Sequence, residues 1–182
     1  FKRAEANERG ASALHGGAGP LRVSDVRGKH ELVEAFIEGA VARGIQRNDD
    51  FNGPTQDGVG YVQLTTGGGR RCSSARGYLR NVKHEGSLTV ETGALTRKIL
   101  FDGLRAIGVQ YEQDGRSIEA YARHEVIVSA GAFQSPQLLQ CSGVGPADLL
   151  RDIGVKQVVD LPGVGQNLHD HLQVRVMYRC TK

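Results

Sequence analysis

The residues best suited to chemistry are a group of small side chains followed by a Ser-Pro pair. Ala130, Gly131 and Ala132 come directly after the apolar run EVIVS, so almost no side chain is left at the end of a predicted strand. A flat ligand or another backbone segment could lie close to the main chain there. Ser135 is typical of helix N-caps and Pro136 of the first helical position, so we expect a helix to begin at Pro136.

These residue types leave two interpretations open. The N-terminus of a helix favours a phosphate or another anion, and open α/β sheets bind nucleotides where strand ends face helix starts. A nucleotide site at residues 130–135 is therefore one interpretation. The other is that small residues simply allow a helix to pack tightly against a strand, with no ligand involved.

A metal site is the alternative to a nucleotide site that the histidines suggest. His169 and His171 flank Asp170, and on a strand they would project to one face and could bind a metal ion. No third ligand is evident, so we interpret them as structural histidines that form hydrogen bonds. Cys72, Cys141 and Cys180 are widely spaced, without a CxxC pair or a zinc spacing, and we expect no metal and no disulfide framework.

A complete dinucleotide fingerprint and a nucleic-acid site are both missing. The stretches GVGYVQ, GVGPAD and GVGQNL each have the first two glycines of G-x-G-x-x-G and lack the third. The segment GGGRRCSSARGYLRNVK is basic, but Tyr78 is its only aromatic residue, so it lacks the stacking platform of an RNA-binding module. We interpret its arginines either as a solvated face or as residues that tie this segment to another part of the protein, and we expect no nucleic-acid partner.

Composition narrows the class of protein without naming a partner. The chain has 182 residues, of which 39% are hydrophobic, and its 23 basic and 20 acidic side chains give a net charge of only +3. No stretch is apolar enough to span a membrane, no signal peptide is evident, and the cysteine pattern suits a reducing compartment, so we expect a cytoplasmic protein. Because Met177 is the only methionine, we expect the chain to be part of a longer protein.

The patterning predicts a mixed α/β fold. Apolar spacing predicts a helix over residues 32–41 that ends at Gly44, and further helices over 74–79 and 146–152. Short β-rich runs begin at residue 87, with a hairpin turn at Asp114-Gly115. We also expect a strand over 61–66, a strand over 125–130 covered on both faces, and strands at both ends of the stretch 154–180.

At this point the residues carry a family resemblance. The stretch GAFQSPQLLQCSGVG resembles the second signature of the glucose-methanol-choline (GMC) family of FAD-dependent alcohol oxidoreductases, and the matching positions are Gly131, Ser135, Pro136, Leu138, Leu139, Ser142, Gly143 and Gly145. The segments GPLRVSD, DFNGPTQDGVGYVQLTT, RCSSARGYL, HEVIVSAGA and LPGVGQNLHDHL also resemble family segments, in the family's order. The resemblance covers essentially the whole chain and is strongest to the choline-dehydrogenase-like branch.

The resemblance implies FAD as cofactor and part of a Rossmann-like FAD/NAD(P)-binding domain with an interleaved substrate-domain portion. It assigns residues 1–85 to substrate-side and cofactor-flanking segments, 86–145 to the FAD-binding domain, and 146–182 to a return toward the substrate domain. It places Thr96 beside the adenine through backbone groups, although the family often has an aliphatic residue there. The expected cofactor-binding residues are Thr96, Ala130, Gly131, Ala132 and Ser135.

The implied reaction is hydride transfer from a primary, choline-like alcohol to the flavin, with oxygen or a quinone as electron acceptor. The family's catalytic histidine lies in a segment that none of the six histidines here resembles, so no catalytic residue is assigned and the isolated chain is expected to be inactive. The alternative is a non-catalytic nucleotide-binding or interaction domain on the same scaffold.

Overall fold

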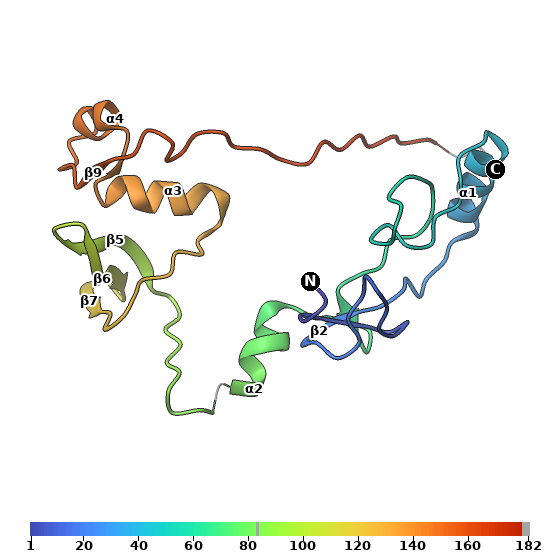
Figure 1. Ribbon diagram of the computed structural model, residues 1–182, viewed down its shortest axis with the longest axis horizontal. Helices are drawn as coiled ribbons and strands as arrows, with labels where there is room; N and C mark the ends of the chain where they lie inside the picture. The colour runs from blue at the N-terminus through green and yellow to red at the C-terminus, as the bar shows by residue number, and fades with distance from the viewer. Residues whose placement is uncertain (83, 180–182) are drawn as a thin grey trace. The chain divides into compact units, whose positions relative to one another are not determined.

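The computed structural model describes residues 1–82 and 84–179 of the chain. The chain folds into two compact units, Phe1–Val90 and Glu91–Lys182. They run from blue to green and from green to red in Figure 1. Both units contain helices and strands, in agreement with the mixed content that the sequence predicts.

The first unit is built on two very small sheets. A parallel pair joins β1 (Glu5–Asn7) to β2 (Leu21–Val23), and an antiparallel pair joins β3 (Thr66–Gly67) to β4 (Arg70–Arg71). The predicted strand over 61–66 is largely wrong, because only a single bridge between Leu64 and Ser24 and the first residue of β3 fall within it. A single bridged residue pair does not extend into a ladder, so residues 61–65 form no strand.

Helix prediction in this unit is confirmed. The helix α1 (Glu31–Ala42) begins at the N-cap His30, whose side chain accepts a hydrogen bond from the N–H of Leu32. It ends before Gly44, whose φ of +91° is the left-handed conformation that a glycine after a helix supplies. The predicted helix over 74–79 is found as a π-helical turn, η1 (Ala75–Leu79), followed by the short α2 (Arg80–Val82).

The second unit contains a three-stranded antiparallel meander. Its strands are β5 (Leu95–Asp102), β6 (Arg105–Gln113) and β7 (Arg116–Tyr121). The predicted hairpin turn at Asp114-Gly115 joins β6 to β7, and both residues have positive φ, 50° and 73°. This is the conformation of a type I′ turn, whose twist matches that of the paired strands.

Two helices and a short parallel pair complete the second unit. The helix α3 (Gly131–Cys141) packs against β5, and β8 (Val144–Gly145) pairs with β9 (Val159–Asp160). The helix α4 (Ala147–Asp152), with Pro146 as its N-cap, confirms the predicted helix over 146–152. The core of this unit is small and includes Ile99, Val144 and Leu150.

Two predicted strands are absent from the residues that the structure describes. The run 125–130 forms no ladder, and Ile127 within it is 77% exposed, which contradicts a strand covered on both faces. The stretch 172–179 runs extended in Figure 1 and forms no strand, so β9 is the one expected strand that is confirmed within the described residues of 154–179. Residue 180 lies outside the described residues. A strand needs a neighbouring edge to pair with, and apolar composition alone does not supply one.

Candidate functional site

A groove in the second unit brings two of the predicted binding residues together. It has a volume of about 580 Å³ and is bounded by residues 94–97 at the start of β5, by the segment 126–130, and by the facing side of α3. Thr96 and Ala130 both line it, although they come from different elements. The small side chain of Ala130 leaves the backbone accessible at one wall.

The strand β5 offers backbone groups to this groove. It is an edge strand, since β6 pairs with only one of its sides. The ladder shifts register between Thr96 and Lys98, beside the groove. Such irregularities at a sheet edge commonly lie next to binding sites, because they redirect the backbone.

Ser142 connects β5 to the C-terminal end of α3. Its buried hydroxyl accepts a hydrogen bond from the N–H of Ile99 at 2.8 Å and donates one to the carbonyl of Leu138 at 2.5 Å. The sequence contained the signal, since Ser142 belongs to the matched signature, but its part in positioning the groove was missed. A strand N–H that donates to a loop hydroxyl cannot be inferred from spacing along the chain.

The predicted helix start at Pro136 is wrong. The helix α3 begins at Gly131 with Ala130 as its N-cap, and Pro136 lies inside it. Gly131 has a φ of +89°, which lets the chain turn into the helix earlier than a residue with a side chain would. Ser135 is therefore a helical residue, and its hydroxyl accepts a hydrogen bond from the N–H of Ala130 at 3.1 Å.

The remaining predicted residues lie in the first turns of α3, outside the groove lining. Ala132 lines a different pocket of about 380 Å³, together with Phe133, Pro136 and Gln140. Gly131 shapes the turn, and Ser135 fixes the backbone at Ala130. The N–H groups of the first helical turn have no partners within the helix, so they are the donors that α3 can offer to a ligand.

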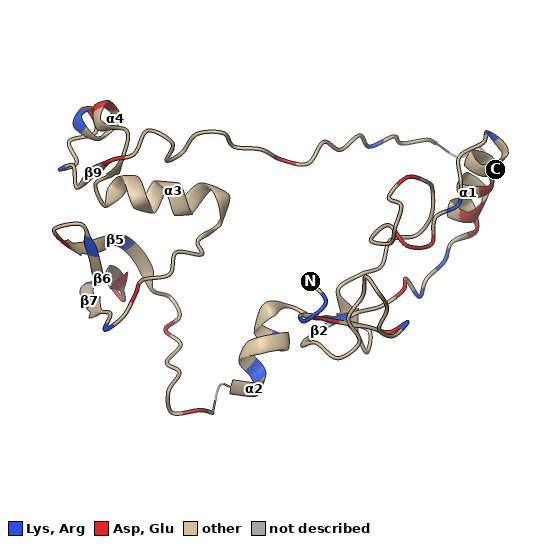
Figure 2. Cartoon of the chain, in the orientation of Figure 1, with Lys and Arg blue, Asp and Glu red and all other residues tan. Residues whose placement is uncertain are grey.

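The groove suits binding rather than acid-base chemistry. Its described lining contains no histidine, aspartate or glutamate, and its one charged side chain, Arg97, is paired with Glu112 at 2.6 Å. Figure 2 shows α3 without a charged residue. Uncharged walls and a backbone edge favour a ligand that is held by main-chain hydrogen bonds and by the faces of its rings.

The rival sites receive no support from the residues that the structure describes. His169 and His171 are exposed and lie outside any strand, and no cluster in the described ranges could hold a metal ion. Cys72 is buried and Cys141 exposed, both as free thiols, while Cys180 lies outside the described residues. None of the described helices is long and apolar enough to cross a membrane.

Sequence comparison finds choline dehydrogenases among the relatives of this chain. The family model described as GMC oxidoreductase matches residues 1–173. The chain is 48% identical over 182 residues to an oxygen-dependent choline dehydrogenase of Paraburkholderia phytofirmans, covering 99% of this chain and 32% of that protein. It is 49% identical over 184 residues to the enzyme of the same name from Stenotrophomonas maltophilia, covering 100% of the chain and 33% of the relative. The chain thus spans about a third of the length of these relatives.

Solved structures share the fold. An FAD-dependent oxidoreductase from Chaetomium thermophilum superposes with a TM-score of 0.85 at 27% identity, over 93% of this chain and 32% of that one. A pyridoxine 4-oxidase from Mesorbium loti superposes with a TM-score of 0.80 at 30% identity, over 89% of this chain and 32% of that one. These similarities confirm the expected fold class, α/β with part of a Rossmann-like FAD-binding domain.

Proposed function

The chain belongs to the GMC oxidoreductase family, and from this premise we propose that it forms part of the FAD site of an enzyme that oxidises a primary alcohol. The family assignment confirms FAD as the expected cofactor. The choline dehydrogenases among the relatives support oxidation of an alcohol CH–OH group. A choline-like substrate, hydride transfer and the inactivity of the isolated chain are part of the proposal.

The observation that carries this proposal is the groove between β5 and α3. Thr96 presents the backbone of an edge strand, and Ala130 presents a wall with almost no side chain. An adenine ring lying there would find main-chain donors and acceptors along β5 and an uncharged surface on α3. The donors of the first turn of α3, from Gly131 onward, suit the anionic part of a dinucleotide.

The residues present fit a part of FAD rather than the whole reaction centre. Once bound, FAD would supply the hydride acceptor for the alcohol oxidation, and this chain's residues would hold and orient the cofactor. Ser135 keeps the N–H of Ala130 in place, and Ser142 keeps β5 and α3 at a fixed separation. The groove lining contains no histidine, aspartate or glutamate that could take the proton from the alcohol hydroxyl.

We propose a division of the chain that agrees with the groove. Residues 86–145, which contain the groove, form the FAD-binding portion, residues 1–85 form substrate-side and cofactor-flanking segments, and residues 146–182 return toward the substrate domain. We propose oxygen or a quinone as the electron acceptor and a cytoplasmic location.

The test adds bulk to the groove wall and compares it with the same change on an exposed strand. In the holoenzyme, Ala130→Leu places a larger side chain on the groove wall, and Ala120→Leu adds the same atoms at an exposed position of β7. We expect Ala130→Leu to weaken FAD binding at least tenfold by flavin fluorescence titration, and Ala120→Leu to change it less than threefold. Equal effects of the two variants would contradict the assignment of the groove.

A second readout separates the enzyme from a binding domain. Turnover of primary alcohols by the wild-type holoenzyme, with oxygen or a quinone as acceptor, supports the proposed reaction. FAD binding without any alcohol oxidation would instead favour a non-catalytic nucleotide-binding domain on this scaffold.

A further inference from the structure

A nearly buried histidine lies between two carboxylates in the first unit. The Nδ1 atom of His15 is 2.9 Å from Oε1 of Glu5, and its Nε2 atom is 2.9 Å from Oδ2 of Asp50. The side chains of His15, Glu5 and Asp50 are 11%, 16% and 34% exposed. Glu5 belongs to β1 and Asp50 to the loop after α1, so one imidazole ring joins segments that are far apart in the sequence.

The two carboxylate contacts favour a proton on both ring nitrogens. A neutral imidazole has one N–H and one lone pair, whereas both nitrogens of His15 face carboxylate oxygens. The hydrogen bond to Glu5 and then the one to Asp50 raise the pKa of His15 above its ordinary value, and they outweigh the opposing effect of burial. The charged ring is therefore the form that satisfies both partners.

The two carboxylates differ in how firmly they are held. Glu5 also accepts hydrogen bonds from the side-chain amide of Asn7 at 2.9 Å and from the N–H of Gly16 at 2.9 Å. Asp50 accepts from the N–H of Asn52 within its own loop at 3.1 Å. Among the described residues 1–82 and 84–179, Asp50 forms an ion pair with His15 and with no other side chain. Asp50 is also the more exposed of the two carboxylates, so it is the partner that can turn to water.

The loop that carries Asp50 is internally tied. The side-chain amide of Asn48 donates to the carbonyls of Thr55 and Asp57, each at 3.0 Å, and the N–H of Val59 donates to the carbonyl of Gln46 at 2.9 Å. These bonds close residues 46–60 into one piece. The loop can therefore move as a unit when an attachment to the rest of the first unit is lost.

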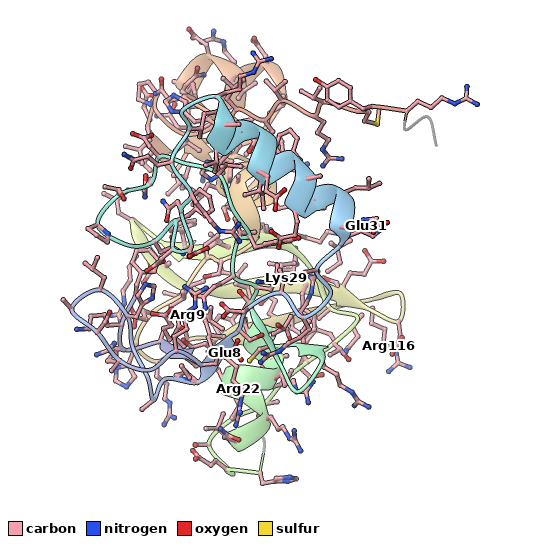
Figure 3. The ribbon with its side chains drawn as sticks, turned by 90° about the vertical axis from the view of Figure 1, so that its right-hand side faces the viewer. Glu8, Arg9, Arg22, Lys29, Glu31 and Arg116 are labelled. Atoms are coloured by element: carbon pink, nitrogen blue, oxygen red, sulfur yellow. The ribbon has the colours of Figure 1, made fainter. Side chains whose placement is uncertain are left out.

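A second attachment of this loop does not depend on His15. Arg9, labelled in Figure 3, donates to the carbonyl of Asp49 at 2.7 Å and forms an ion pair with Asp25 at 2.7 Å. Its guanidinium stays charged across the pH range in which a histidine titrates. The other groups facing His15 are the amides of Asn7 and, beyond it, Gln63, which carry no charge.

We propose that His15 is a pH-responsive clasp that holds the loop 46–60 against β1 and releases its Asp50 end when the ring loses a proton. The neutral ring keeps its single N–H on Glu5, which is the more buried partner and is fixed by Asn7 and Gly16. The Nε2 lone pair then faces the carboxylate of Asp50, and the repulsion turns this side chain outward. Arg9 keeps the loop tethered at Asp49, so the loop loosens without detaching.

The experiment follows the ring and the loop in the same protein. Long-range ¹H–¹⁵N NMR of the imidazole nitrogens gives the titration midpoint of His15, which we expect above 6.5. Hydrogen exchange of peptides from 46–60, corrected for the intrinsic effect of pH, should lose protection several-fold through the same midpoint. Protection that stays constant while the ring titrates would overturn the proposal.

Variants assign the effect to His15. His15→Gln should remove the pH-dependent part of the loop's exchange, and the matched control His124→Gln, at an exposed histidine of the other unit, should leave it unchanged. Asp50→Asn should lower the midpoint of His15 and loosen the loop at every pH. A loop that keeps its pH dependence in His15→Gln, or a midpoint unaffected by Asp50→Asn, would rule out the clasp. If His15→Gln does not fold, the wild-type comparison and Asp50→Asn still decide.

Discussion

The hydroxyl of Ser142 accepts a hydrogen bond from the backbone N–H of Ile99 at 2.8 Å, and both residues are buried. This contact joins the edge strand β5 to the end of α3. Because β5 and α3 form opposite walls of the groove, the separation of these walls depends on a hydroxyl that lies outside the groove lining.

Replacing Ser142 by alanine should destabilise the second unit. The change leaves the N–H of Ile99 buried without an acceptor, which costs about 1–3 kcal/mol. Urea unfolding followed by far-UV circular dichroism measures the loss. Ser117→Ala, at an exposed position of β7, is the control and should change the free energy of unfolding by less than about 0.5 kcal/mol. A loss no larger than that of the control would show that the N–H of Ile99 finds another partner.

Gly143→Ala should be more costly than Gly154→Ala. Both glycines have positive φ, +89° and +70°, so a left-handed alanine costs about 1–2 kcal/mol at either position. A Cβ at Gly143 would in addition collide with the carbonyl oxygen of Lys156, whereas the space at Gly154 is open. Thermal unfolding should therefore show a larger drop in Tm for Gly143→Ala. Equal drops would mean that the segment around Lys156 moves aside freely.

Ser135 should influence cofactor affinity without touching the cofactor. Ser135→Ala removes the acceptor of the Ala130 N–H, a net loss of about 0.5–1.5 kcal/mol, or roughly 2- to 12-fold in Kd if all of it reaches the bound state. Ser135→Thr keeps a hydroxyl and should restore most of the affinity. FAD titration of the holoenzyme measures both variants. If Ser135→Ala leaves the Kd for FAD unchanged, Ser135 stabilises the helix but does not affect cofactor binding.

The stability of the first unit should peak at mildly acidic pH. The raised pKa of His15 contributes stability that is complete below its unfolded value, 6.5, and is lost as pH rises through the folded pKa. Burial alone would raise the pKa of Glu5, but its hydrogen bonds with His15, Gly16 and Asn7 lower it below 4.5. Its contribution is complete above 4.5 and is lost as pH falls through the folded pKa.

The maximum should therefore lie roughly between pH 4.5 and 6.5. Differential scanning calorimetry at closely spaced pH values checks this window. His15→Gln should abolish the decline on the alkaline side, and a profile that keeps rising through neutral pH would contradict the assignment to His15.

Local features were predictable because their causes lie within a few residues. The end of α1 depends on Gly44, and the hairpin between β6 and β7 depends on Asp114 and Gly115. The predicted start of α3 was wrong because the positive φ of Gly131 lets the helix begin there, before Ser135 and Pro136, which prefer the first helical turn. Sequence preferences identify candidate residues for a helix start, but they do not give the free-energy difference between two candidate starts.

Features that depend on distant partners could not be predicted in this way. The run 125–130 has the composition of a strand, yet a ladder depends on an edge supplied from elsewhere. The family resemblance pointed to Thr96 and Ala130, which line the same groove, and their contact with a cofactor stays a prediction. The contact of Ser142 with Ile99 was not predicted. The grouping of Glu5, His15 and Asp50 has no local pattern at all, because it arises only when separate segments pack together.

The extended stretch 172–179 has a practical consequence for handling the chain. Leu172, Val174 and Met177 are 95%, 81% and 91% exposed, on a backbone that pairs with no other strand in the described residues. An apolar segment with unused backbone hydrogen-bonding groups is a template for pairing between molecules. Preparations of the isolated chain should therefore aggregate with increasing concentration, and charged replacements at Leu172 and Val174 should keep them dispersed.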